Sequence, residues 1–135
     1  MGYHWVSAED VEYDERPPKE GEQPRRAADL TTAVELQQSR ARLWRYPPHS
    51  TGRRHQDHAQ EEVFVVISGT LTMLLGDAPE RVDVGPGGVV AVEPMTPLQI
   101  RNESDEELVV FVYGAPPRTE GADMLDDVEL PAKTA

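Results

Sequence analysis

Apolar and polar residues alternate in short runs through the second half of the chain. From residue 61 onward these runs are rich in β-branched and aromatic residues, and Gly, Pro, Asp and Asn separate them. The pattern is typical of short strands joined by tight turns, and it favours an all-β sandwich or barrel. No amphipathic segment between the runs is long enough for the helix of a parallel crossover. We therefore expect antiparallel strands at residues 61–68, 70–75, 81–84, 89–93, 98–102 and 107–114.

The segment from Asp29 to Tyr46 is compatible with two patterns. Thr32 and Glu35 have the spacing of a capping box, which would begin a helix. The polar run QQS, however, interrupts any apolar helical face, and the later residues alternate as in a strand. The sequence therefore favours strand. Trp44 and Tyr46 would share one face, where they pack in the core or at a dimer interface, or stack against a ligand.

The two ends of the chain differ in composition from its middle. Residues 1–29 and 115–135 are rich in charged residues and proline and contain few apolar anchors. We expect an extended N-terminal arm and a C-terminal tail, since termini of this kind are held only where they are tied down. Residues 30–114, where most apolar residues lie, would form the barrel.

Composition narrows the classes of partner. The net charge of −12 would repel nucleic acid and anionic membrane surfaces. The chain has no cysteine, which excludes disulfides and thiolate metal sites. Its acidic start differs from a signal peptide, and no apolar run approaches the roughly 18 residues of a membrane span. The expected location is the cytoplasm.

The stretch HQDHAQEE carries the candidate chemistry. On one continuous extended segment Gln56, His58 and Glu62 would point to the same face. Glu62 would then begin an inward row that continues with Phe64 and Val66. A buried carboxylate needs a metal, a cation or hydrogen-bond donors as partner, and His58 is the nearest candidate.

These residues resemble the first motif of the cupin superfamily, G-x5-H-x-H-x3,4-E-x6-G. Glu62 matches the glutamate, and six residues separate it from Gly69, as in the motif. His58 matches the second histidine. Gln56 stands at the first histidine, and His55 lies one place out of register.

A later segment resembles the second cupin motif, G-x5-P-x-G-x2-H-x3-N. Gly87 and Asn102 match its two ends, whereas Glu93 and Met95 replace its proline and second glycine. Leu98 stands where the motif has its histidine. Moving the register by one residue restores the glycine and the proline, but it places a glutamine at the histidine position and loses the asparagine.

The resemblance, which covers roughly residues 30–114, implies a double-stranded β-helix, or jelly-roll barrel. In cupins the two motifs usually bind one divalent metal ion inside the barrel. Here only His58 and Glu62 are in register, and a bulge would be needed to turn His55 inward. We expect no cofactor, with Fe, Mn, Ni, Zn or Cu bound by the two histidines and the glutamate as the alternative.

Two functions follow from this resemblance. The first is a small-molecule-binding cupin whose ligand pocket is formed by Gln56, His58, Glu62, Phe64, Val66, Met73, Leu98 and Ile100. The alternative is a metal-dependent enzyme, such as a dioxygenase, isomerase or decarboxylase, acting on a small organic acid or sugar derivative. Arg53 and Arg54 are either ordinary surface residues or residues that bind an anionic ligand. The resemblance also implies a homodimer.

Overall fold

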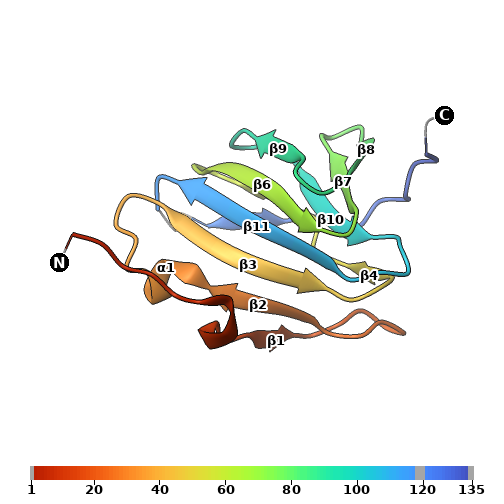
Figure 1. Ribbon diagram of the computed structural model, residues 1–135. Helices are drawn as coiled ribbons and strands as arrows, with labels where there is room; N and C mark the ends of the chain where they lie inside the picture. The colour runs from red at the N-terminus through yellow and green to blue at the C-terminus, as the bar shows by residue number, and fades with distance from the viewer. Residues whose placement is uncertain (1, 118–120, 134–135) are drawn as a thin grey trace.

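Two antiparallel sheets face each other in the computed structural model, which describes residues 2–117 and 121–133. The first sheet has the order β1 (Asp14–Arg16), β2 (Arg25–Asp29), β3 (Arg40–Tyr46), β11 (Leu108–Ala115), β6 (Glu61–Ser68) and β9 (Val89–Val92). The second has the order β12 (Ala122–Met124), β5 (His55–Asp57), β10 (Leu98–Asn102), β7 (Leu71–Leu75) and β8 (Glu80–Val84), and β4 (Ser50–Thr51) also pairs with β10. In Figure 1, β3, β11 and β6 run side by side across the front.

The expected all-β, antiparallel architecture is confirmed. Every strand pair is antiparallel, and the strands from β6 to β11 agree with the expected ranges to within one residue. Gly69 explains one of the turns between them. Its φ is +80°, and a Cβ atom there would lie 2.4 Å from the backbone oxygen of Glu107, so only glycine fits.

The segment between residues 29 and 46 contains both a helical turn and a strand. α1 (Leu30–Ala33) is a single turn whose N-cap is Asp29, and the Asp29 carboxylate accepts hydrogen bonds from the Thr32 amide and hydroxyl. β3 begins after the polar run QQS. The expectation of strand is therefore confirmed for the second half of the segment and wrong for the first, where capping by Asp29 decides the local structure.

Both ends of the chain contribute strands that the sequence did not predict. β2 pairs with β3 so that Ala27 lies opposite Trp44, and β12 pairs with β5. A 3-10 helix of three residues, η1 (Ala8–Asp10), precedes β1, and Tyr3 and Trp5 are largely exposed. Residues 1, 118–120 and 134–135, which belong to the expected arm and tail, lie outside the described part of the chain.

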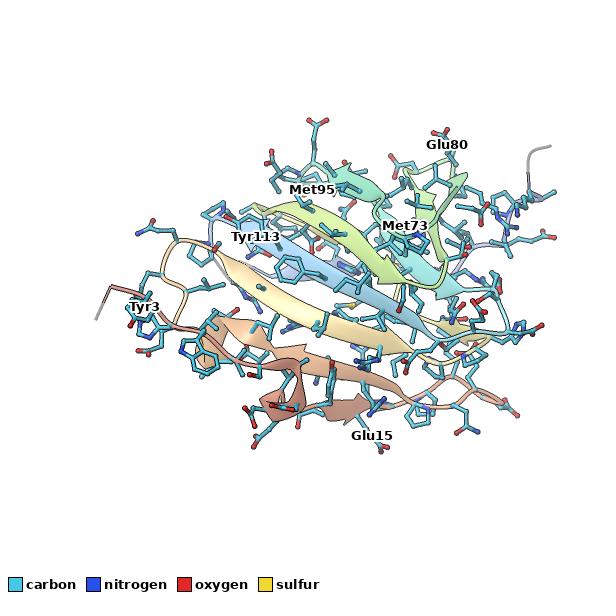
Figure 2. All side chains as sticks on the ribbon, viewed as in Figure 1. Tyr3, Glu15, Met73, Glu80, Met95 and Tyr113 are labelled. Carbon is cyan, nitrogen blue, oxygen red and sulfur yellow. The ribbon has the colours of Figure 1, made fainter. Side chains whose placement is uncertain are left out.

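The hydrophobic core lies between the two sheets. It includes Phe64, Val66, Leu71, Met73, Leu98, Ile100, Leu108 and Val110, all nearly inaccessible to solvent. Figure 2 places Met73 on β7, where the core is filled. Towards β1, β2 and β3 the space between the sheets stays open as a cavity. No helix in the described ranges has the length and apolar character that crossing a membrane requires.

Candidate functional site

A cavity of about 480 Å³ opens between the sheets. Its apolar lining comes from both of them: Trp44, Tyr46, Phe64, Leu98, Ile100 and Val112. Its charged lining comprises five arginines, Arg16, Arg25, Arg40, Arg42 and Arg53, and two acids, Asp57 and Glu62. A volume of this size falls in the range of small-molecule sites.

β3 supplies one side of the cavity through the ordinary alternation of a strand. Arg40, Arg42, Trp44 and Tyr46 occupy every second position and all line the cavity. Gly114 of β11 pairs with both Arg40 on β3 and Glu62 on β6. A Cβ atom at Gly114 would lie 3.2 Å from Gln60 Oε1, so the side-chain amide of Gln60 packs against this glycine.

Arg25 is the most buried cation of the cavity. Its side chain is 7% exposed, its Nη1 donates to the Tyr46 hydroxyl at 3.4 Å, and its guanidinium lies 5.4 Å from the ring centre of Trp44 and 5.5 Å from that of Tyr46. Cation–π attraction of this kind holds a guanidinium in place without neutralising it. The Nε atom of Arg25 is buried and has no hydrogen-bond partner among the described residues.

The cavity carries an excess of positive charge. None of its five arginines forms an ion pair with a carboxylate in residues 2–117 or 121–133. Burial lowers the pKa of the Arg42 guanidinium, and the neighbouring charges of Arg40 and Arg16 lower it further. A chain with a net charge of −12 therefore gathers unpaired cations around its internal cavity.

Glu62 is the acid that faces this space from β6. Burial raises its pKa to about 7, and the charge of Asp57 acts in the same direction. The charges of Arg40 and Arg42 act in the opposite direction but do not outweigh burial. Since a carboxyl with this pKa is part neutral and part ionised near pH 7, it can donate or accept a proton there.

Four of the pocket residues expected from the sequence line the cavity: Glu62, Phe64, Leu98 and Ile100. Val66 and Met73 are buried in the adjoining core instead. His55, which was out of register in the cupin motif, also lines the cavity and pairs with Leu98 between β5 and β10.

Gln56 and His58 do not face the cavity, which corrects the expectation that they share a face with Glu62. Both side chains contact Asp123 of β12, Gln56 Nε2 at 2.8 Å and His58 Nε2 at 2.9 Å. Within β5 the residues that face the cavity are His55 and Asp57, and a turn follows in which the Asp57 carboxylate accepts hydrogen bonds from the amides of Ala59 and Gln60. Residues 55–62 are therefore not one continuous strand, and the alternation assumed for them is broken.

The residues that meet in the cavity do not fit the metal site of the resemblance. In the described part of the chain, no three His, Asp or Glu side chains are grouped so that they could hold a metal ion. His58 is held by Asp123, and Leu98 offers no ligand atom. The arginines on β3 also oppose a divalent cation beside Glu62.

Four of the cavity arginines were not anticipated from the sequence, which pointed only to Arg53 and Arg54. Of that pair, Arg53 lines the cavity, whereas Arg54 donates to the backbone oxygens of Asp126 and Gly76. The signal for Arg40 and Arg42 was present, because they alternate in phase with Trp44 and Tyr46. Arg16 and Arg25 lie in the charged N-terminal segment, where no periodicity indicates a strand.

Comparisons with known proteins agree with this architecture. The family model described as "Cupin domain" matches residues 42–114. The H2HPP isomerase of Bacillus subtilis is 33% identical over 65 residues, which is 48% of this chain but only 27% of that protein.

Two solved structures are similar over most of their length. A sugar phosphate isomerase of the cupin superfamily from Silicibacter pomeroyi has a TM-score of 0.73 and 24% identity, with 91% of this chain and 82% of that chain covered. The polyketide cyclase RemF from Streptomyces resistomycificus has a TM-score of 0.76 and 19% identity, with 93% and 87% covered. At these identities the likeness extends to the fold alone.

Proposed function

This chain belongs to the cupin domain family, and we propose that it binds a small organic anion in the interior of its barrel, with little or no metal. The observation that carries the proposal is the cluster of cavity arginines, which form no ion pair with any carboxylate of the described residues. A buried cation is costly unless it is paired. An anionic ligand supplies the missing partner, and the guanidinium group forms its strongest hydrogen bonds with carboxylate and phosphate oxygens.

The charge of the whole chain strengthens this proposal. With a net charge of −12, the outer surface repels anions at long range. Non-specific attraction therefore does not account for binding, and an anion that enters must be retained by the cavity itself. Burial increases the strength of that retention because the guanidinium groups are less screened by water than at the surface.

The experiment is isothermal titration of the purified protein with small carboxylates and inorganic phosphate, comparing Arg25→Gln with Arg26→Gln. The two residues are neighbours on β2, but Arg25 faces the cavity and Arg26 lies outside it, beside Tyr13 and Glu107. Loss of one charge-assisted hydrogen bond costs about 1.5–3 kcal/mol, so we expect Arg25→Gln to weaken binding at least about tenfold. Arg26→Gln should leave the affinity within about twofold of the wild type.

Two results would contradict the proposal. One is the absence of binding by any of the anions at millimolar concentration. The other is an equal loss of affinity in both variants, which would indicate a surface effect. A thermal melt of each variant checks that Arg25→Gln is folded, and Arg42→Gln provides a second cavity variant if it is not.

A second candidate is an enzyme that moves a proton on the bound anion. The observation in its favour is Glu62, a cavity carboxyl whose pKa is raised to about 7 by burial. Isomerases and a cyclase are among the similar proteins, although these names describe those proteins only. Exchange of the C3 protons of pyruvate in D₂O, faster with the wild type than with Glu62→Gln, would support it, and equal rates would exclude this reaction for pyruvate.

A further inference from the structure

The cavity has an apolar part whose chemistry restricts the body of the ligand. On the inner face of the first sheet, Phe64 of β6 pairs with Val112 of β11. Leu98 and Ile100 of β10 line the cavity from the second sheet, and both are at least 94% buried. A hydrocarbon body placed between these surfaces would lose its contact with water, which is favourable by about 25 cal/mol per Å².

Three polar side chains of the cavity already have contacts within the protein. Gln60 Nε2 donates to the Pro116 carbonyl at 3.0 Å. One carboxylate oxygen of Asp57 accepts two backbone amides, and His55 Nδ1 lies 3.2 Å from the Arg53 carbonyl. Hydroxyl groups placed against Phe64, Val112 and Leu98 would find no partner in these side chains, and each buried unpaired hydroxyl carries a desolvation cost.

The positive charges differ in how well they are balanced. The carboxyl of Glu62 acts on Arg40 and Arg42, and that of Asp29 acts on Arg42. Arg25 has no ion pair in the described ranges. The guanidinium groups of Arg25 and Arg16 both lie beside the Trp44 indole, 5.4 Å and 5.8 Å from its ring centre. Among the cavity arginines of β1, β2 and β3, the two least neutralised therefore lie around Trp44.

We propose that the ligand is a carboxylate carried on an aromatic or aliphatic body, with its carboxylate at Arg16 and Arg25 and its body between Phe64, Val112 and Leu98. This inference rests on the proposed function, because it specifies which organic anion the cavity takes. It distinguishes such acids from sugar acids and sugar phosphates, which carry the same charge on a hydroxylated body.

The test is a set of titrations at constant ionic strength with 3-phenylpropanoate, gluconate and glucose 6-phosphate. Burial of a phenyl group is worth about tenfold or more in affinity, so 3-phenylpropanoate should bind at least about tenfold more tightly than gluconate. Val112→Thr keeps the shape of the side chain but places a hydroxyl against the ligand body, and it should weaken 3-phenylpropanoate about fourfold. Val90→Thr is the matched control, since Val90 is half-buried beside Phe64 but does not line the cavity.

The possible failures separate the two proposals. If gluconate or glucose 6-phosphate binds as tightly as 3-phenylpropanoate, the ligand class is wrong while anion binding stands. If 3-phenylpropanoate binds but Val112→Thr and Val90→Thr have equal effects, the body does not occupy the apolar part, and the inference is again wrong. If none of the three anions binds, the proposed function itself fails.

Discussion

Replacing Glu62 by glutamine should make the stability of this protein less dependent on pH. In the folded protein, burial first and the charge of Asp57 second raise the pKa of Glu62 from an ordinary value of 4.5 to about 7. In the unfolded chain the carboxyl is solvated and has its ordinary pKa. Between these values the folded state binds more protons than the unfolded state, so stability falls as the pH rises from about 4.5 to about 7.

The size of the effect follows from the same two values. A pKa that rises from 4.5 to about 7 corresponds to about 3 kcal/mol of unfolding free energy. Glu62 lines a cavity that water can enter, so solvent relieves part of this cost. We expect the wild type to lose between about 1 and 3 kcal/mol between pH 5 and pH 8 through this group.

The assay is urea denaturation at pH 5 and pH 8 in amine chloride buffers, which contain no organic anion. Near pH 5 the protonated carboxyl resembles the amide of glutamine, so the two proteins should have similar stability. At pH 8, Glu62→Gln should be more stable than the wild type by about 1–3 kcal/mol. Glu61→Gln is the control, because Glu61 is the exposed neighbour on β6, and its effect should not change with pH. A stability difference between Glu62→Gln and the wild type that is equal at both pH values would refute the reasoning.

Three further predictions concern composition, folding and assembly. Protein purified without chelator should hold well under one transition-metal ion per chain by elemental analysis, and a stoichiometric ion would contradict this. Asn102→Ala should lower the unfolding free energy, measured by urea denaturation, by about 3 kcal/mol. The reason is that Asn102 is fully buried and donates to the carbonyls of Tyr46, Pro47 and Glu106. A loss below about 1 kcal/mol would contradict this prediction. We also expect a homodimer formed through the outer face of the first sheet, where Val89 is 58% exposed and Tyr113, which projects from β11, is 40% exposed (Figure 2). Light scattering should show a dimer that Val89→Lys converts to a monomer, and a monomeric wild type would contradict the prediction.

The strands and the inner rows of the barrel were predictable because they depend on local alternation. Phe64, Leu98 and Ile100 could be assigned to the interior from a period of two and from the turn residues around them. The predicted side-chain direction was wrong for His58, where a hydrogen-bonded turn interrupts the strand. The carboxylate of Asp57 forms the turn that separates β5 from β6, so the alternation of β6 does not extend back to His58, which contacts Asp123.

The cationic part of the site depends on long-range pairing, which a local pattern does not contain. Arg25 lies in a charged segment with few apolar residues, and it reaches the cavity because β2 adds to the edge of the sheet beside β3. The small residues Ala27 and Ala28 allow this addition, since both are almost completely buried there. Charge and proline content suggested an arm, whereas sheet pairing places the same residues in a barrel wall.

The two kinds of motif residue in this cupin can be separated by what they contact. Gly69 and Asn102 are needed for backbone geometry, the first in a turn with positive φ and the second through hydrogen bonds to three carbonyls. These roles persist whatever the cavity binds. At the positions that face the interior, Leu98 offers no ligand atom, and Glu62 faces arginines rather than a cluster of histidines. Different residues therefore determine the backbone geometry of the fold and the chemistry of its cavity. The arginines of β1, β2 and β3 determine the chemistry of the cavity.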